Sequence, residues 1–278
     1  MIERFHKTSQ QCSRITTENY STSFAAAIRL LHKDIRTDIY NIYGFVRFAD
    51  EIVDSFHGYN KEQLLRSFRA ETFSAIEEKI SLNPILHSFQ ITANKYNIEL
   101  SLIDAFFQSM QYDLHKNYFT ESSYEKYIYG SAETVGLMCL RIFCTGDEVL
   151  YDRLKDYARS LGAAFQKVNF LRDMKADREQ LDRMYFPGCN FNNFTPEQKK
   201  RIETDIQRDF DRAYEGMLQL PARARLGVYV AFKYYYSLFK KIKRLQPKSV
   251  LRNRIRIPDH AKIFILAKAG LRYQFNIL

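Results

Sequence analysis

Apolar residues recur at helical spacing along much of the chain. One long stretch repeats them at steps of three and four residues, which places them on one face of a helix of about six turns. These positions are Leu150, Leu154, Tyr157, Leu161, Ala164, Phe165, Val168 and Leu171. No alternating run of apolar and polar residues between turn residues predicts a β-strand. The pattern therefore favours an all-α protein.

Helix-start signals divide this pattern into elements. Asn83-Pro84 and Thr195-Pro196 each join a capping side chain to a proline suited to the first helical turn, and Gln198 completes a capping box with Thr195. All six prolines lie where a helix is expected to begin or end. Because no repeat, low-complexity tract or linker interrupts the chain, we expect roughly ten helices in a single domain over residues 1–278.

Composition supports a folded domain of this kind. Of 278 residues 46% are hydrophobic and 15% aromatic, while ten glycines and six prolines are few for an all-β chain. No apolar run reaches the roughly 18–20 residues of a spanning helix, and the chain starts with a polar segment, so we expect a soluble cytoplasmic protein without a signal peptide. The four cysteines form no CxxC pair and the six histidines no HExxH or Cys/His cluster, which predicts reduced thiols and no zinc site.

The net charge of +10 comes from one region. Between Arg223 and Arg272 the sequence holds 14 Lys and Arg against a single acid, Asp259. Such a region can contact an anionic membrane surface, a nucleic acid or a polyphosphate, or it can be an ordinary solvated face.

Two aspartates in the segment FADEIVD stand one helical turn apart, where like charges destabilise a helix. If residues 35–55 form a helix, Arg47, Asp50 and Asp54 lie within about 40° of Tyr43 around the axis, and apolar side chains spread around the rest. This polar stripe is either the solvent face or the lining of an internal cavity.

A second polar stripe follows from QKVNFLRDMKAD. Gln166, Asn169, Asp173 and Asp177 fall within an arc of about 80°, beside the long apolar stripe. If the two helices face each other, their carboxylates converge, and only cations could hold them together.

The chemistry of these side chains indicates which cation. Ligands that offer only oxygen suit a hard ion, and Mg²⁺ binds through a few carboxylates together with substrate phosphates. Arg47, Arg172 and Arg183 could hold the phosphates from the other side. The sequence thus predicts a site that ionises a diphosphate.

Several segments resemble the squalene/phytoene synthase family, the head-to-head prenyl diphosphate synthases, and are most similar to its bacterial phytoene synthases. The segments are STSFAAAIRLL from Ser21, IYNIYGFVRFADEIVD from Ile39, YIYGSAETVGLM from Tyr127, AAFQKVNFLRDMKADREQLDRMYFP from Ala163, and YYSLFKKI from Tyr235 with Arg254, Pro258 and Lys262. The resemblance implies an all-α helical bundle of the isoprenoid synthase type with a central active-site cavity.

The resemblance also implies roles for individual residues. Metal ligands would be Asp50, Asp54, Asn169, Asp173 and Asp177. Contacts with the diphosphate or the first-formed intermediate would come from Ser21, Ser23, Phe24, Tyr43, Arg47, Gln166, Asn169, Arg172, Arg183, Tyr185 and Tyr235. Catalysis would depend on Asp50, Asp54, Asp173, Asp177, Arg47 and Tyr235.

Some of these positions also have a simpler interpretation. Ser21 and Ser23 could cap a helix, Tyr235 could be packing, and Arg183 with Tyr185 could form a packed turn. Two departures from the family pattern are Glu51, where many relatives carry Asp, and Asp182, where Gly is usual.

The implied reaction joins two geranylgeranyl diphosphates into phytoene through a cyclopropyl (prephytoene) diphosphate, in carotenoid biosynthesis. The implied cofactor is Mg²⁺, with Mn²⁺ as a substitute, and the basic region is expected to rest on an anionic membrane surface. The alternative substrate is farnesyl diphosphate, giving squalene or dehydrosqualene, with NADPH required only for squalene. Two further alternatives are a non-catalytic helical assembly factor and a basic nucleic-acid-binding protein. The first would be expected to lose the carboxylates, and the second lacks a reading motif, so we expect no nucleic-acid partner.

Overall fold

The computed structural model describes residues 2–115 and 118–274, and within these ranges the chain forms thirteen α-helices, two π-helical segments and no β-strand. The helices are α1 Ile2–Tyr20, α2 Thr22–Arg29, α3 Lys33–Asp54, α4 Lys61–Glu78, α5 Pro84–Lys95, α6 Leu100–His115, α7 Glu121–Ile128, η1 Tyr129–Glu133, α8 Thr134–Cys144, α9 Glu148–Ala176, η2 Asp177–Leu181, α10 Pro196–Leu218, α11 Ala222–Lys243, α12 Pro247–Val250 and α13 Asp259–Gln274. The all-α prediction is confirmed.

The predicted helix starts are where the sequence places them. Asn83 accepts hydrogen bonds from the backbone amides at the start of α5, and Pro84 is its first residue. Thr195 and Gln198 form the expected capping box at the start of α10. The helix count exceeds the expected ten because short helices such as α2, α7 and α12 have too few turns to give a periodic signal.

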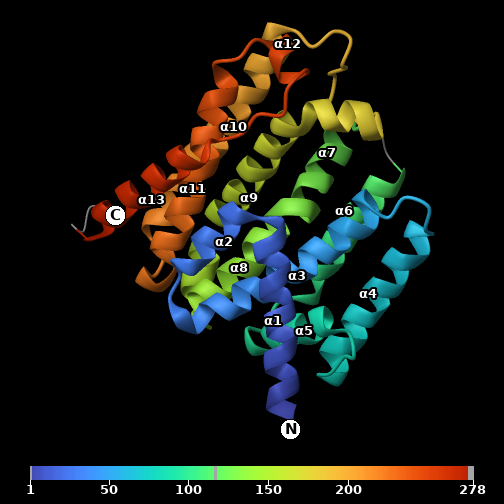
Figure 1. The fold of residues 1–278 in the computed structure, drawn as a ribbon, viewed down its shortest axis with the longest axis vertical. Helices are drawn as coiled ribbons and strands as arrows, with labels where there is room; N and C mark the ends of the chain where they lie inside the picture. The colour runs from blue at the N-terminus through green and yellow to red at the C-terminus, as the bar shows by residue number, and fades with distance from the viewer. Residues whose placement is uncertain (1, 116–117, 275–278) are drawn as a thin grey trace.

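The helices surround a central cavity. In Figure 1 the long helix α9 crosses the middle of the bundle, with α3 and α8 beside it, α4 on one outer side, α13 on the other, and α5 at the lower end next to α1. α9 packs against α8, α10 and α11, while α3 packs against α1, α5 and α8. The lining of the central space therefore comes from helices that are far apart in the sequence.

Aromatic clusters fill the core on two sides of that space. Phe45 of α3 stacks on Phe89 of α5 with ring centroids 3.9 Å apart, and Phe107 of α6 meets the edge of the Phe45 ring. On the other side Phe210 of α10 lies 5.5 Å from Phe239 of α11. These buried rings contribute area burial and favourable ring geometry, and they fix the helices that carry polar side chains.

Two glycines allow the helices to approach closely beside the cavity. A Cβ added to Gly130 in η1 would lie 2.4 Å from the carbonyl oxygen of Ala105 in α6. A Cβ on Gly162 in α9 would lie 2.5 Å from the carbonyl oxygen of Ala132. The continuous α7–η1–α8 unit thus packs backbone-close between α6 and α9, where a larger residue would force the helices apart.

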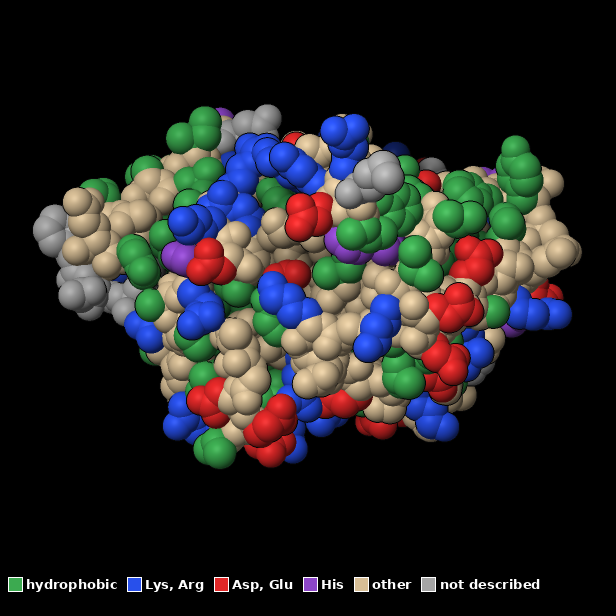
Figure 2. Space-filling model, turned by 90° about the horizontal axis from the view of Figure 1, so that it is seen from below, with side chains coloured by type: hydrophobic (Ala, Val, Ile, Leu, Met, Phe, Trp, Pro, Cys, Tyr) green, Lys and Arg blue, Asp and Glu red, His purple; other side chains and the backbone are tan. Residues whose placement is uncertain are grey.

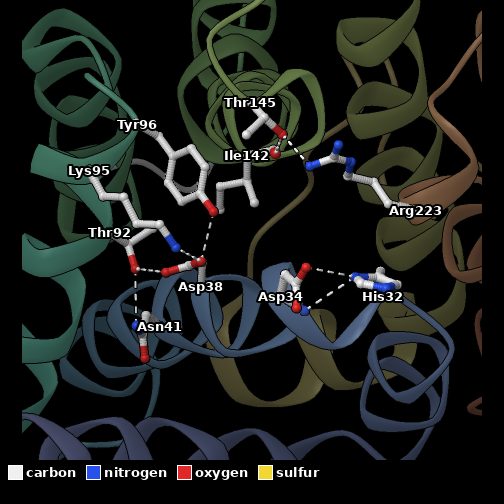
Figure 3. A network of polar contacts seen from close by, with 10 residues as sticks. All are labelled: His32, Asp34, Asp38, Asn41, Thr92, Lys95, Tyr96, Ile142, Thr145 and Arg223. Atoms are coloured by element: carbon white, nitrogen blue, oxygen red, sulfur yellow. Dashed lines mark hydrogen bonds and ion pairs between the residues drawn. The ribbon is translucent and has the colours of Figure 1, made fainter.

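A buried aspartate ties α5 to α3 (Figure 3). Asp38 is 4% exposed and accepts hydrogen bonds from Lys95 and Tyr96, each at 2.8 Å, and from Thr92 at 3.1 Å. Asn41 donates to Thr92 at 3.0 Å. The carboxylate therefore has a partner on both oxygens, as a buried charge requires.

The structure adds two findings to the sequence predictions. No described helix combines the length and the apolar character needed to cross a bilayer. All four cysteines are unpaired, as predicted.

Two histidines join the first helix to α5. The buried His87 accepts a hydrogen bond at Nδ1 from the backbone amide of Ser81 at 3.2 Å, which leaves its Nε2–H to donate to Nδ1 of His6 at 2.7 Å. Burial, and then the proximity of His6, lower the pKa of His87. The folded state therefore favours the neutral ring more than the unfolded chain does.

This shift predicts a pH-dependent stability. Because the folded-state pKa of His87 is depressed, its contribution is present above the unfolded pKa of about 6.5 and is lost as the pH falls below it. We expect the free energy of unfolding, measured with urea, to fall from about pH 8 to about pH 5.5. His87→Gln should fall less over the same range.

The matched control is the same substitution at the exposed His57. An equal change in pH dependence in His57→Gln and His87→Gln would contradict the assignment to His87.

Candidate active site

Helix α3 contributes the first polar stripe to a central cavity of about 640 Å³. Tyr43, Arg47, Asp50 and Asp54 all line this cavity, while Phe45 and its apolar neighbours pack on other faces of the helix. Of the two interpretations of this stripe, the structure therefore supports the lining of a cavity, with Asp54 exposed at its open end.

Helix α9 and the segment after it contribute the second stripe to the same cavity. Gln166, Asn169 and Asp173 line it from α9, and Asp177 lines it from the first position of η2. The sequence pattern predicts a regular helix through Asp177, whereas the structure changes to π-helical turns there. Such single π turns are frequent at functional sites.

The carboxylates of the two stripes interact with one another. Burial raises the pKa of Asp177 to about 8, and the charges of Asp173 and Asp54 act in the same direction. Burial also raises the pKa of Asp50 to about 8, with the charge of Asp54 adding to it. Since Asp54 belongs to α3 and Asp177 follows α9, the predicted convergence of the two acidic stripes is present in the structure.

The exposed carboxylate at the mouth is affected less strongly. Surrounding protein raises the pKa of Asp54, while the positive charges of Arg183 and Arg47 oppose the rise. Because Asp54 remains open to water, solvent screens these interactions more than at Asp50.

Arginines balance part of this negative charge. Arg47 forms an ion pair with Glu51, and its guanidinium lies 4.4 Å from the ring centre of Tyr20. Glu51 is one of the two departures from the family pattern, and in this structure it holds Arg47 rather than joining the lining of the cavity.

Asp173 lies between two guanidinium groups. Arg172 donates to it from Nε at 3.0 Å, and Arg254 lies 2.9 Å from its other oxygen. Arg254 comes from the irregular segment between α12 and α13 and lines the cavity. The sequence motif includes Arg254, but it gives no reason to pair that residue with Asp173, because their contact spans most of the C-terminal third of the chain.

The donor set fits a hard cation. Oδ1 of Asn169 is buried and has no hydrogen-bond partner, while its Nδ2 donates to Oε1 of Gln166 at 3.3 Å. An unpartnered buried oxygen beside raised-pKa carboxylates is satisfied by a metal ion. Among the described residues no three His, Cys, Asp or Glu side chains are near enough together to hold an ion alone. The ligands present thus fit Mg²⁺ whose coordination is completed by phosphate oxygens and water.

The N-terminal serines have different positions. Ser21 is the N-cap of α2, where its Oγ accepts from the backbone amide of Phe24 at 3.2 Å, and it also bonds to the hydroxyl of Tyr43. Ser21 and Phe24 line the cavity, whereas Ser23 is half-buried outside the described lining. The helix-cap interpretation therefore holds for Ser21, and it leaves that residue facing the cavity.

Aromatic rings form a wall next to the polar mouth. Phe165 stacks on Tyr235 at 3.9 Å, and Phe24 lies 5.8 Å from Tyr235 and 5.7 Å from Tyr43. Tyr235 also bonds to Asn169 beside it. Ring faces of this kind attract a nearby cation and exclude water.

The remainder of the cavity is apolar. Its walls come from α2, α3, α8, α9, α10 and α11. The side chains include Ile28, Leu31, Ile39, Val135, Leu140, Phe143, Leu154, Leu161, Met217, Leu220 and Val228. Charged side chains on one part of the lining and apolar side chains on the remainder suit a ligand with an anionic head and a hydrocarbon tail.

Arg183 and Tyr185 both bond to Asp113, a residue that lines the cavity together with Tyr185 and is not among the site residues predicted from the sequence. Arg183 is 5% exposed, and its Nη1 lies 2.9 Å from the carboxylate of Asp113 in α6. Burial raises the pKa of Asp113 to about 7, against the charge of Arg183. A sequence signal existed, because Asp113 continues the buried stripe of Phe106 and Met110 at helical spacing.

The second departure from the family pattern has a structural reason. Asp182 adopts φ 46°, the left-handed region that glycine enters most readily. Aspartate tolerates this region better than most residues, so the turn that leads to Arg183 forms without glycine.

The chain is similar in sequence to known proteins over most of its length. Residues 17–260 match the squalene/phytoene synthase family. The chain is 27% identical over 273 residues to a 15-cis-phytoene synthase of Paracoccus, covering 90% of this chain and 87% of the relative. It is 28% identical over 207 residues to a 4,4'-diapophytoene synthase of Staphylococcus haemolyticus, covering 72% and 69%.

Solved structures show the same fold. A dehydrosqualene synthase in complex with a ligand superposes with a TM-score of 0.84 at 18% identity, covering 97% of this chain and 98% of that one. The squalene synthase HpnC from Alicyclobacillus acidocaldarius gives a TM-score of 0.76 at 20% identity, covering 88% and 95%. These structures confirm the isoprenoid synthase type of fold, and the match over residues 17–260 shows that the chain belongs to the squalene/phytoene synthase family.

Proposed function

We propose that the protein condenses two prenyl diphosphates head to head, with two geranylgeranyl diphosphates giving phytoene as the principal reaction. The observation that carries the proposal is one cavity in which two acidic stripes and several arginines lie beside a largely apolar lining. Relatives named phytoene synthase, aligned over most of this chain, support the choice of product.

The mouth is suited to the departure of diphosphate. Mg²⁺, held by Asp50, Asp54, Asn169, Asp173 and Asp177 together with the diphosphate, would neutralise the charge that develops on the leaving group. Arg47 and Arg172 offer fixed donors to the same oxygens. Preorganised charges of this kind stabilise a transition state strongly because water is excluded.

The reaction proceeds in two stages. In the first, the C–O bond of one allylic diphosphate breaks, and the double bond of the second substrate attacks the resulting cation. Loss of a proton closes the cyclopropane ring and leaves the second diphosphate attached. In the second stage that diphosphate departs, the cation rearranges to the 1-1′ link, and a further proton loss gives the polyene.

The aromatic wall would protect the carbocations. Phe165, Tyr235 and Phe24 present ring faces beside the mouth, where a carbocation formed by loss of diphosphate would lie. Ring faces stabilise positive charge, and their packing keeps water from capturing it.

Farnesyl diphosphate is the alternative substrate. A diapophytoene synthase among the relatives and a dehydrosqualene synthase among the structures favour considering it. Incubation with each substrate, with and without NADPH, followed by mass analysis of the product, separates the possibilities. A C40 product formed without NADPH is the expected result, and a C30 product would replace the first choice by the alternative.

Neutralising a carboxylate on either stripe is expected to remove activity. Asp50→Asn and Asp173→Asn should each lower Mg²⁺-dependent turnover of geranylgeranyl diphosphate about 10²–10³-fold, because each removes a preorganised charge partner. Asp50→Asn should unfold at the same or a higher temperature than the parent, since it removes a carboxyl group whose charge is disfavoured first by burial and then by Asp54.

The control lies on the same helix as one of these residues. Asp152→Asn alters an exposed aspartate of α9 paired with Lys155 and should leave turnover unchanged. Robust activity in both Asp50→Asn and Asp173→Asn would overturn the assignment of these carboxylates.

We also propose that the protein docks on an anionic membrane through α13. This helix lies on the outside of the bundle next to α11 (Figure 1), held by the buried Ala269 and by Arg272, which donates to the hydroxyl of Tyr229 at 2.9 Å. Its outer face exposes Ile263 and Phe264, each at 67%.

The charged and apolar side chains on α13 support its docking on an anionic membrane. Leu271 adds a third exposed apolar side chain to the same face, and Lys268 stands beside it. Basic side chains also gather toward the upper edge of the face seen in Figure 2. An apolar helix face flanked by basic residues is typical of a helix that lies in a bilayer interface.

Vesicle flotation tests the docking. Phosphatidylcholine vesicles that contain phosphatidylglycerol should carry the protein, vesicles without it should carry less, and Phe264→Glu should abolish flotation because a charge replaces an inserted ring. Leu82→Glu changes a 92% exposed leucine in the turn before α5 and serves as the control. Flotation that does not depend on anionic lipid, or is equal in both variants, would contradict the proposal.

A further inference from the structure

A buried carboxylate outside both acidic stripes organises the wall of the cavity. Asp113 lies near the end of α6, is 7% exposed and lines the cavity. Tyr127 of α7 donates to Oδ2 at 2.8 Å, and Tyr185 donates to Oδ1 at 3.2 Å. Arg183 lies 2.9 Å from Oδ1 and also bonds to the backbone carbonyl of Asp113.

The three partners come from two different segments, the α7–η1 unit that packs on α6 and the irregular chain after η2. Tyr127 precedes η1, whereas Arg183 and Tyr185 belong to the irregular chain between η2 and α10. All three are buried, Tyr127 at 3% and Tyr185 at 8% exposure. A single carboxylate therefore fixes a guanidinium from a segment that has no helix of its own to position it.

Arg183 is anchored at the end of the second acidic stripe. Its backbone amide donates to the carbonyl of Asp177 at 3.1 Å. Its guanidinium is held from the other side, because Nη1 donates to Asp113 at 2.9 Å and to the hydroxyl of Tyr185 at 2.9 Å. The backbone contact and the Asp113 carboxylate together fix this guanidinium next to a residue of the second stripe.

We propose that Asp113 is a positioning residue for the reaction: it holds Arg183 at the end of the second acidic stripe, next to Asp177, where that guanidinium stabilises the charge of the metal–diphosphate site. The proposal rests on the proposed function and adds to it a residue outside the predicted motifs. Asp113 acts through Arg183 and is not itself a ligand of the diphosphate.

A purely structural role is the competing explanation, because Asp113 also joins α6 to the chain that follows η2. Tyr118, which follows α6 in the chain, also meets the chain after η2 in an isolated bridge with Met184. Loss of stability in a variant therefore does not distinguish the explanations, and the test needs a kinetic readout with a matched buried aspartate.

Asp38 provides that match. It is as buried as Asp113 and holds a cationic side chain and a tyrosine, Lys95 and Tyr96, but it lies outside the described lining of the cavity. Both Asp113→Asn and Asp38→Asn remove a charge while keeping the size of the side chain. Both should lower the melting temperature.

Only Asp113→Asn is expected to change the kinetics. Its kcat should fall about 10–100-fold per folded molecule, comparable to the loss of a residue that orients a metal ligand, because Arg183 loses the group that positions it, and Asp113→Glu should recover part of it. Asp38→Asn should keep kcat within about twofold of the parent.

A double-mutant cycle tests whether Asp113 acts through Arg183. In an Arg183→Gln background, Asp113→Asn should lower kcat by less than about twofold further, because the residue through which it acts is gone. Additive effects, or equal kinetics for Asp113→Asn and Asp38→Asn, would overturn the proposal.

A ligand-binding measurement by melting temperature tests this proposal separately from the proposed function. Mg²⁺ with inorganic pyrophosphate should raise the melting temperature of the parent and of Asp38→Asn, and raise that of Asp113→Asn by clearly less. If the parent binds Mg²⁺ and pyrophosphate but turns over no prenyl diphosphate, the proposed function fails and the melting shifts decide on Asp113. A parent that shows neither turnover nor a shift overturns both.

Discussion

The burial of several carboxylates in one cavity, reinforced by the charges of their acidic neighbours, is the constraint on which the rest of the structure depends. Asp50 and Asp177 come from distant parts of the chain, yet each has a pKa near 8 because burial and neighbouring acids disfavour its charge. A protein keeps such groups only if the surrounding packing outweighs their cost and a cationic ligand later offsets it. The apolar faces of α3 and α9 provide that packing, and Arg183 and Arg254 offset part of the charge within the protein itself.

The structure therefore combines a tightly packed helical core with irregular backbone at the acidic end of the cavity. Three kinds of contact hold the helical core in place. They are stacked rings such as Phe45 on Phe89, the hydrogen bonds of Asp38, and the close helix approach at Gly130. The acidic end of the cavity instead contains the π-helical segment η2, then Asp182 in the left-handed backbone conformation, and then irregular chain as far as α10. The proposed reaction needs the packed core to hold the two acidic stripes at a constant separation. It also needs the groups around the stripes to accommodate a large anion.

Sequence alone predicted what depends on local periodicity. The helix bearing Asp50, the capping box at Thr195 and the two polar stripes all follow from spacing along the chain. Spacing could not show that Arg254 would meet Asp173, since that contact depends on how α12 and the following segment fold back. It did not single out Asp113 either, because spacing places this acid on a buried stripe but does not show which residues balance its charge. The π-helical turns were equally hidden, as no residue type specifies them.

Those π-helical turns have a consequence for how the sequence can vary. In η1 the backbone hydrogen bonds span five residues instead of four, so this turn contains one more residue than a regular α-helical turn. Deleting one residue there would restore an ordinary helix, but it would rotate α7 by about 100° against α8 and carry Tyr127 away from Asp113. We therefore expect homologous chains to differ at these positions by exchange of amino acids, while the number of residues between α7 and α8 stays constant.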